Sequence, residues 1–352
     1  MVKKKLKIAV VMGGNSAERD VSLSSGAGIM EGLRAAGHEP IGIDTALGAG
    51  QLTLQRKALN GGIKAEPPSV NDLSKISGEN AVATISSPDL KEVDLVFLAL
   101  HGGMGENGTI QAILDIMGIP YTGSGVLASA AAMDKHFAKM IFIAAGVPTP
   151  DFLLKFAADI TGETELIENI DSCLGFPVVV KPNDQGSSVG LDIAHEKSSL
   201  FTIARKAAEY SGKILFEKYI PGRELTVGIL GDETLPVVEM RPHDGFYDYK
   251  HKYTTGMTDY IVPASLSPEQ EARIRELGLM AFRALGCDGY ARVDFRMSLN
   301  GELYCLEVNT LPGMTATSLV PKAAKAAGIE FPELLDRIAR IALARNKNRM
   351  SH

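Results

Sequence analysis

The sequence predicts an α/β protein built from several packed units, and three features support this fold class. A strand–helix–strand pattern fills residues 6–44, and such βαβ units commonly open an α/β layer. A nearly continuous apolar run from Val93 to Leu100 is typical of a buried strand. Short strands and helical stretches then follow one another along the 352-residue chain. At roughly 100–200 residues per domain, this length indicates two or three domains.

The first unit is the most clearly marked. Leu6–Met12 and Pro40–Asp44 are predicted strands, and Ala17–Ala36 between them is a predicted helix. Ser16 stands where an N-cap residue is expected, and Gly37 stands at the C′ position after the helix.

The next stretch, Ala46–Pro88, has scattered Gly, Ser, Asn and Pro with weak periodicity. We therefore expect a surface excursion there. The strand Val93–Leu100 then ends in a polar loop, residues 101–108, and a helix is predicted over Thr109–Met117.

The later elements are predicted from apolar periodicity and from the turn residues that separate them. No internal repeat or low-complexity tract interrupts them. In order, we expect a helix over Ser129–Ala145, a buried strand over Phe176–Lys181, a strand from Leu191 to Ala194, strands over Leu215–Ile220 and Leu225–Leu230 that open a third unit, and helices over Pro268–Leu285 and Phe331–Ala344.

Composition excludes several classes of function. A formal charge of −6 gives no basic surface for nucleic acid. No apolar stretch approaches the ~18–20 residues of a membrane span, and the N-terminal apolar run Ile8–Met12 is too short for a signal peptide. Cys173, Cys287 and Cys305 show no ligand spacing and cannot all pair. We expect a cytoplasmic protein without nucleic-acid or membrane partners.

Residues 291–309 form the most informative stretch, because Asn300-Gly301 between two alternating runs is a strong hairpin signal. A two-residue loop would place Leu299 opposite Glu302 and would fix the remaining pairs. Those pairs are Val293 with Val308, Phe295 with Leu306 and Met297 with Tyr304 on an apolar face, and Asp294 with Glu307 and Arg292 with Asn309 on the other face.

The polar face of this hairpin predicts a metal site. Two directly opposed carboxylates, Asp294 and Glu307, repel each other unless a positive charge lies between them. Asn309 points to the same side as Glu307, and an all-oxygen set of this kind suits Mg²⁺. The alternative is a surface hairpin whose acids pair with Arg292 and Arg296.

A glycine- and serine-rich loop, Lys181–Gly190, follows a predicted strand and could close its backbone N–H groups over phosphate oxygens. It is not a Walker A loop, and an ordinary turn is the alternative. The loop also matches G-x-S-x-G with Ser188 at its centre, which raises a serine hydrolase. A nucleophile elbow leads directly into a helix, whereas a strand is expected here, so a hydrolase is disfavoured.

The segment Gly123–Ala128 fits G-x-G-x-x-A, a pattern found in dinucleotide-binding sites. It lacks a preceding buried strand and the acidic residue that such a site requires. We interpret it as a turn that leads to the helix carrying Lys135.

Several short motifs recur in one order along nearly the whole chain, and together they resemble the D-alanine–D-alanine ligases of the ATP-grasp superfamily. The motifs are residues 13–22 (GGNSAERDVS), 101–108 (HGGMGENG), 121–125 (YTGSG), 133–135 (MDK), 181–190 (KPNDQGSSVG), 217–218 with 222–224 (EK, GRE), 247–253 (YDYKHKY), 263–264 (PA), 307–315 (EVNTLPGMT) and 318–321 (SLVP).

The resemblance implies a three-domain ATP-grasp architecture with an N-terminal Rossmann-like (preATP-grasp) domain. The domains would be 1–122, a central ATP-grasp subdomain 123–214, and a C-terminal subdomain 215–352 with the metal site. ATP would lie between the second and third domains, and the amino acids between the first and third. The implied reaction passes the terminal phosphate of ATP to a D-alanine carboxylate, and a second D-alanine amine attacks the acyl phosphate. Two Mg²⁺ or Mn²⁺ ions, a homodimer and a role in peptidoglycan precursor synthesis are expected.

The resemblance also implies roles for individual residues. Glu18 would hold the first substrate's ammonium group, with Ser187 and Tyr253 as hydrogen-bond partners. The nucleotide would be contacted by Lys135, Lys181, Ser187, Ser188, Glu217 in the adenine hinge and Glu224 at the ribose.

The reacting centre is implied in the same way. Asp294, Glu307 and Asn309 match the metal ligands, which agrees with the hairpin prediction. Arg292 and the N–H of Gly313 would stabilise the oxyanion of the tetrahedral intermediate. Ser318 and Leu319 would receive the carboxylate of the second substrate. Lys252 would lie near the phosphate, and His101 near the first substrate.

Two departures from the family pattern are Asn107, where Asp is usual, and Gly256-Met257 in the loop after Tyr253. Tyr253 favours D-alanine over D-lactate as acceptor, by family analogy. The alternatives are a D-Ala–D-lactate, D-Ala–D-Ser or other ATP-grasp dipeptide ligase, and a non-catalytic nucleotide-binding protein. The intact set of Arg292, Asp294, Glu307 and Asn309 argues against the last alternative.

Overall fold

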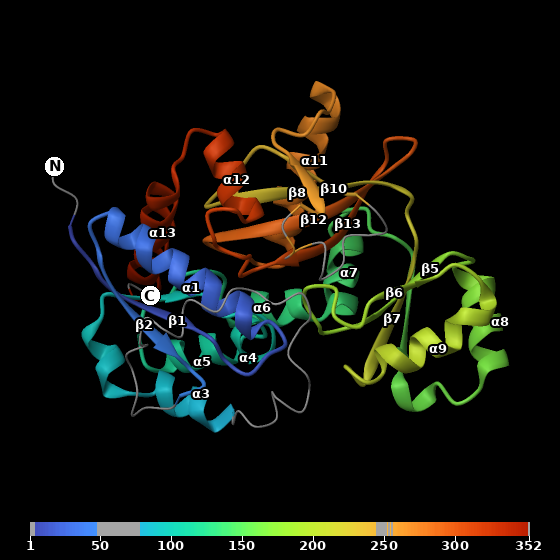
Figure 1. Ribbon diagram of the computed structural model, residues 1–352, viewed down its shortest axis with the longest axis horizontal. Coiled ribbons are helices and arrows are strands. Elements are labelled where there is room, and N and C mark those ends of the chain that lie inside the picture. Colours follow the sequence, from blue (N-terminus) through green and yellow to red (C-terminus); the bar gives the residue numbers. More distant parts are fainter. Residues whose placement is uncertain (1–3, 48–77, 244–251, 253, 255, 351–352) are drawn as a thin grey trace.

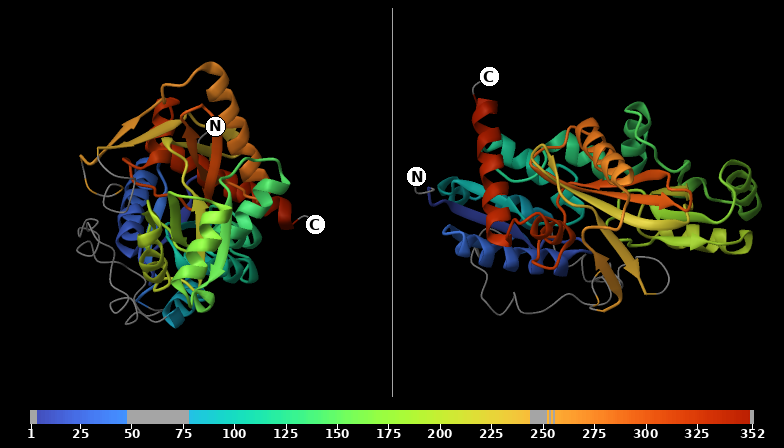
Figure 2. Two further views of the ribbon diagram at one scale, coloured as in Figure 1. Left: turned by 90° about the vertical axis from the view of Figure 1, so that its right-hand side faces the viewer. Right: turned by 90° about the horizontal axis from the view of Figure 1, so that it is seen from above.

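The computed structural model describes residues 4–47, 78–243, 252, 254 and 256–350, which form three β-sheets with helices packed around them (Figures 1 and 2). In Figure 1 the N-terminal sheet lies at the left, and the sheet that packs against helices α8 (Glu163–Cys173) and α9 (Lys197–Ala207) lies at the right. The described part of the chain has no helix both long and apolar enough to cross a membrane.

The first sheet is parallel, in the order β2 (Glu39–Asp44), β1 (Lys7–Met12), β3 (Leu95–Leu98). Helix α1 (Arg19–Ala35) connects β1 to β2, which confirms the predicted βαβ unit. The predicted N-cap is wrong, because Glu18 rather than Ser16 occupies that position. The Ser16 hydroxyl instead donates a hydrogen bond to the carbonyl of His101.

The first unit continues through four short helical segments. They are α3 (Gly78–Ile85), the 3₁₀ helix η2 (Pro88–Glu92), α4 (Gly103–Glu106) and α5 (Thr109–Ile116). Most of the predicted surface excursion, residues 48–77, lies outside the described residues. The prediction is wrong for its last part, because Ala81 and Ile85 of α3 are buried in the core.

The single helix predicted over Ser129–Ala145 is two helices, α6 (Val126–Met133) and α7 (Lys135–Ala144). Asp134 has extended backbone angles, and its carboxylate Oδ1 accepts a hydrogen bond from the backbone N–H of Phe137 at 3.0 Å. An N-cap of this kind starts a new helix and ends the old one. Lys135 therefore sits in the first turn of α7.

The second sheet is antiparallel, in the order β4 (Phe152–Phe156), β7 (Lys213–Lys218), β5 (Val178–Pro182), β6 (Asp192–Ala194). Beside it lie the 3₁₀ helix η3 (Ala157–Asp159) and the helices α8 (Glu163–Cys173) and α9 (Lys197–Ala207), whose apolar faces share its core. The prediction that Leu215–Ile220 opens a third unit is wrong, because β7 lies inside this second sheet. The three domain boundaries themselves remain a prediction.

The third sheet is antiparallel and follows the order β11 (Thr258–Ile261), β10 (Val238–Pro242), β8 (Gly222–Leu230), β12 (Tyr290–Ser298), β13 (Leu303–Asn309), with β9 (Glu233–Thr234) paired to β8. Helix α11 (Pro268–Ala284) packs against it and begins with a capping box between Ser267 and Gln270. Two further helices, α12 (Leu319–Ala326) and α13 (Phe331–Met350), end the chain.

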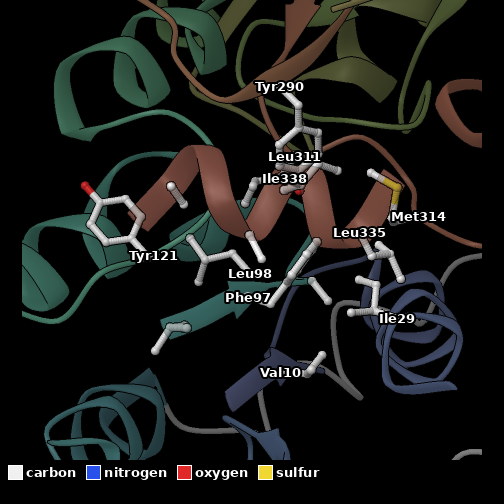
Figure 3. Close-up of a cluster of buried hydrophobic side chains, with 14 of the residues drawn as sticks. Val10, Ile29, Phe97, Leu98, Tyr121, Tyr290, Leu311, Met314, Leu335 and Ile338 are labelled. Carbon is white, nitrogen blue, oxygen red and sulfur yellow. The ribbon is translucent and has the colours of Figure 1, made fainter. Parts of the chain in front are cut away.

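Helix α13 returns to the N-terminal sheet, as Figure 3 shows. Its Leu335 and Ile338 belong to the same buried cluster as Phe97 of β3 and Tyr290 of β12. At its edge, Asp336 pairs with the buried His38, with Nε2 and Oδ1 3.0 Å apart. The first sheet and the end of the third sheet thus share one core, which fixes their relative positions around the site.

The predicted hairpin exists as β12 and β13, but its loop is longer by one residue. The N–H of Ser298 donates to the carbonyl of Glu302 at 2.8 Å, so the loop is Leu299–Gly301. Phe295 therefore pairs with Cys305 and Met297 with Leu303, and the predicted apolar pairs with Leu306 and Tyr304 are wrong.

A β-bulge then restores the predicted register of the polar face. Between Phe295 and Asp294 the pairing shifts by one residue, and Leu306 is the extra residue on β13. Asp294 lies opposite Glu307 and Arg292 lies opposite Asn309, as predicted. The shift introduced by the loop and the shift introduced by the bulge cancel at the carboxylates.

Candidate functional site

The predicted site residues gather around two adjoining cavities. The larger cavity has a volume of about 440 Å³ and lies between the first and third sheets, and the smaller one, of about 120 Å³, lies between the second and third sheets. Tyr253 lies outside the described residues. The others line one or both cavities: Glu18, His101, Arg292, Asn309, Gly313 and Ser318 the larger; Lys181, Ser188, Glu217, Glu224 and Asp294 the smaller; and Lys135, Ser187, Lys252, Glu307 and Leu319 both.

Glu18 is a buried carboxylate in the larger cavity, with 7% of its surface exposed. The Ser187 hydroxyl donates to its Oε1, which joins the N-terminus of α1 to the glycine-rich loop. Gly186 permits this close approach, because a Cβ there would lie 2.4 Å from Glu18 Oε2. A desolvated carboxylate in a cavity favours a cationic ligand group such as an ammonium.

Two more titratable groups face the same cavity. His101 is buried, with Nε2 3.1 Å from the Ser25 hydroxyl, and burial lowers its pKa, which favours the neutral ring. Glu106 accepts a 2.6 Å hydrogen bond from the N–H of Gly102, and burial together with the charge of Glu18 raises its pKa to about 8. Glu106 therefore carries a proton at neutral pH.

The carboxylates of the hairpin are held by cations and a hydroxyl. Asp294 accepts from Thr226 Oγ1 at 2.6 Å and from Arg292 Nε at 2.9 Å. Glu307 pairs with Lys135 Nζ at 3.0 Å. Burial alone would raise the pKa of Glu307, but Lys135 and neighbouring lysines lower it to about 2. Of the arginine pairs in the alternative interpretation, Arg292 does pair with Asp294, but Asp294 is buried and Arg296 pairs with Glu224 instead.

The oxygen atoms of Asp294, Glu307 and Asn309 fit a divalent ion whose other ligands are water and phosphate. Asp294 and Glu307 are opposed, and Asn309 Oδ1 accepts a 3.1 Å hydrogen bond from the N–H of Leu311 while lining the larger cavity. Within the described ranges, no group of three or more His, Cys, Asp or Glu could hold a metal by itself. Two carboxylates and one amide leave the remaining positions to water and phosphate, as Mg²⁺ commonly requires.

The smaller cavity combines an apolar slot with charged ends. Val179, Met240 and Leu306 supply apolar lining. Glu224 pairs with Arg296 at 3.3 Å, while burial raises the pKa of this carboxyl. An apolar cavity with a carboxyl group among its lining residues suits a nucleoside.

Lys139 was not predicted as a site residue from the sequence, yet it pairs with Glu217, which lines this cavity. Its side chain is fully buried, and Nζ lies 2.5 Å from Glu217 Oε2 and from Thr149 Oγ1. Lys181 Nζ lies 3.1 Å from the other Glu217 oxygen, Oε1. The only available signal was its spacing of four residues from Lys135, which places both lysines on one face of a helix.

The glycine-rich loop lies between the two cavities. Ser187 and Ser188 both have left-handed backbone angles, with φ of 47° and 59°. Lys252 Nζ donates to Ser188 Oγ at 3.0 Å. Strand β6 follows the loop, as predicted, so Ser188 is not on a strand-to-helix nucleophile elbow.

The last part of the larger cavity is formed by the segment before and within α12. Ser318 is the N-cap residue of α12, and its hydroxyl accepts from the N–H of Thr315 at 3.1 Å. Gly313 lies beside it, since a Cβ there would be 3.3 Å from Ser318 Oγ. Lys322, one turn further along the helix, also lines the cavity and was not predicted.

Comparison with known proteins matches almost the whole chain. The family model described as D-ala D-ala ligase N-terminus matches residues 7–124, and the D-ala D-ala ligase C-terminus model matches residues 141–340. The chain is 39% identical over 348 residues to a D-alanine–D-alanine ligase of Pelotomaculum thermopropionicum, covering 96% of this chain and 97% of the relative. It is 42% identical over 346 residues to that of Halalkalibacterium halodurans, covering 96% and 99%.

Solved structures give the same result. The D-alanine–D-alanine ligase of Bacillus anthracis superposes with a TM-score of 0.76 at 36% identity, covering 98% of this chain and 99% of that one. The same ligase complexed with ATP gives 0.74 at 34% identity, covering 99% and 100%. The VanG D-Ala:D-Ser ligase of Enterococcus faecalis gives 0.76 at 31% identity, covering 96% and 100%.

Proposed function

This chain belongs to the D-alanine–D-alanine ligase family, and we propose that it uses ATP to join two D-alanines into D-alanyl-D-alanine for peptidoglycan precursor synthesis. One observation carries the proposal. The cavity with a buried carboxylate, Glu18, adjoins the cavity with the lysines and the glycine-rich loop, and Lys135 and Glu307 line both. An amino-acid carboxylate in the first cavity can therefore meet a phosphate in the second.

The first D-alanine would bind through its ammonium group to the buried carboxylate of Glu18, which accepts a hydrogen bond from the Ser187 hydroxyl. Ser187 would fix that carboxylate from the other side of the cavity. A neutral His101 adds a polar neighbour without adding a second positive charge. This arrangement would leave the substrate carboxylate free to react.

The nucleotide would place its base in the apolar slot beside Leu306 and its ribose near Glu224. Its phosphates would lie near Lys135 and Lys181, under the glycine-rich loop that contains Ser188. These lysines bring positive charge to the junction of the cavities, where the terminal phosphate would pass to the D-alanine carboxylate.

Asp294, Glu307 and Asn309 would hold the metal, for which we propose two Mg²⁺ or Mn²⁺ ions. When bound, the ions would neutralise phosphate charge and polarise the transferred phosphoryl group. Arg292 and Lys135, which pair with these carboxylates, would keep the surrounding charge balanced.

The second step would join the amine of the second D-alanine to the acyl phosphate carbon. A C–N bond forms, the C–O bond to phosphate breaks, phosphate leaves and the amine loses a proton. Arg292 and the N–H of Gly313 would stabilise the oxyanion that develops on the carbonyl oxygen. Ser318 and the N-terminus of α12 at Leu319 would receive the acceptor carboxylate.

We further propose a cytoplasmic homodimer that prefers D-alanine to D-lactate as acceptor. The preference for amine over hydroxyl acceptors depends on Tyr253, outside the described residues. D-serine is the second acceptor to consider, because the VanG D-Ala:D-Ser ligase is among the similar structures.

The test is phosphate release from Mg-ATP by the purified protein, with products identified by mass. The reactions would contain D-alanine, L-alanine, or D-alanine with an excess of D-lactate or D-serine. We expect phosphate in equal amount to D-alanyl-D-alanine, and none with L-alanine. A Glu18→Gln variant should release little phosphate under the same conditions. No release with D-alanine, or D-alanyl-D-serine as the main product in mixtures, would contradict the proposal.

A further inference from the structure

Lys322 is a cation in the larger cavity that the proposed roles do not use. It lies on α12, one turn after Ser318, and both side chains line the cavity. Its Nζ donates to the carbonyl of Thr317 and lies 4.3 Å from the centroid of the Tyr260 ring. A carbonyl on one side and an aromatic face on the other hold the ammonium group in a defined place.

Among the described residues, two other cations of this cavity pair with carboxylates, whereas Lys322 has no counter-ion. Lys135 pairs with Glu307, and Arg292 pairs with Asp294. Within the described residues, no carboxylate lies within 4.0 Å of the Lys322 ammonium group. The side chain is half-buried, and burial lowers its pKa. A partly desolvated cation that faces a cavity gains most from an anionic ligand.

The polar groups around Lys322 match a carboxylate rather than a phosphate. The hydroxyls of Ser318 and Thr315 lie 2.8 Å apart beside it, and α12 begins at Leu319. One ammonium, one hydroxyl and the first N–H groups of a helix offer donors to two oxygens. The lysines that would hold phosphate line the other cavity or the junction.

We propose that Lys322 binds the carboxylate of the second amino acid and thereby selects acceptors that have a free carboxylate. This inference rests on the proposed function and adds a residue that sets acceptor specificity. Lys322 acts on binding of the acceptor, so activation of the first D-alanine proceeds without it.

Hydroxylamine separates these two steps because it is a nucleophile without a carboxylate. Its nitrogen attacks the acyl phosphate carbon, the C–O bond to phosphate breaks, and D-alanyl hydroxamate and phosphate form. The donor D-alanine is kept below the concentration at which a second D-alanine competes. Dipeptide synthesis over a wide D-alanine range gives the acceptor KM for the same enzyme preparation.

In Lys322→Met we expect the acceptor KM to rise at least about tenfold, the effect of losing one charge-assisted hydrogen bond. Hydroxamate formation should stay within about twofold of wild type, which also shows that the variant is folded. Lys322→Arg should recover most of the acceptor KM. Lys325→Met, an exposed lysine of the same helix, is the matched control and should change neither reaction.

An unchanged acceptor KM in Lys322→Met would overturn the inference. A parallel fall of hydroxamate and dipeptide synthesis would also overturn it, since that pattern indicates a structural role. If the wild-type protein forms neither product from D-alanine, the proposed function fails, which is a different result.

Discussion

Replacing Glu217 by Gln tests how much the buried ion pairs at the smaller cavity contribute to stability. Its carboxylate holds Lys139 Nζ at 2.5 Å and Lys181 Nζ at 3.1 Å, and 3% of the residue is exposed. Burial would raise the pKa of Glu217, yet the two ammonium groups lower it below its usual value. Glutamine has the same shape but no charge, so Lys139 would stay buried without an ionic partner.

The magnitude follows from that unpaired charge. Breaking a buried ion pair by removing one partner costs about 3–5 kcal/mol, out of a net stability of about 5–15 kcal/mol for a typical protein. At roughly 2–4 °C per kcal/mol for a large domain, the apparent melting temperature should fall on the order of 10 °C. The ATP-dependent shift in melting temperature should fall as well, because Lys181 loses the group that positions it.

The pH dependence gives a second signature. Burial lowers the pKa of Lys139, and Glu217 opposes that shift. Without Glu217 the folded-state pKa falls further below the unfolded value, so the unfolded chain binds more protons in the interval between them. Stability of the variant then rises with pH in this interval. The deficit relative to wild type should therefore narrow as the pH rises toward the ordinary lysine pKa of ~10.4.

Two variants complete the experiment. Lys139→Met combined with Glu217→Gln removes the unpaired charge and should recover much of the lost stability. Glu333→Gln breaks an exposed ion pair with Arg337 and should cost less than about 0.5 kcal/mol. The reasoning fails if Glu217→Gln melts within about 2 °C of wild type, or if the double variant is no more stable than the single one.

The remaining predictions concern the metal carboxylate, the protonated acid and the glycine-rich loop. Glu307→Gln should fold normally but lose most of its turnover, with the largest loss at limiting Mg²⁺; equal turnover at every Mg²⁺ concentration would contradict the metal assignment. The raised pKa of Glu106, about 8, means that the folded state binds more protons than the unfolded state between roughly pH 4.5 and 8, so stability falls as pH rises there. Glu106→Gln should flatten this slope in melting curves taken from pH 5 to 9, and an unchanged slope would assign it to other groups. Gly186→Ala should raise the donor KM at least about tenfold, because the added Cβ would lie 2.4 Å from Glu18 Oε2, whereas Gly212→Ala has no atom within 4 Å and should be neutral in the same assay.

The hairpin shows which features of a structure sequence periodicity can predict and which it cannot. Asn300-Gly301 correctly located the turn, and alternation correctly placed Asp294 opposite Glu307. The same signal did not distinguish a two-residue loop from a three-residue loop, because a glycine with positive φ suits both. The apolar pairs were therefore wrong by one residue, while the bulge at Leu306 corrected the pairs beyond it.

Buried charges were the other feature that sequence patterns did not reveal. Lys139 lies four residues after Lys135 and no sequence pattern singled it out, yet it is fully buried against Glu217. Its partner comes from β7, a strand that was predicted to open the third unit rather than to lie in the second sheet. A long-range ion pair depends on which strands meet, and local periodicity carries no such information.

The bulge would also allow one strand to contribute to both the proposed nucleotide site and the proposed metal site. In a regular strand, neighbouring residues point to opposite faces, so Leu306 and Glu307 could not both line one cavity. The extra residue on β13 breaks the alternation, and both side chains line the smaller cavity. Leu306 then faces the apolar slot while Glu307 stays opposite Asp294. The apolar surface proposed for the base and the carboxylate proposed for the metal are thus adjacent in sequence, and their separation is fixed by the backbone of a strand.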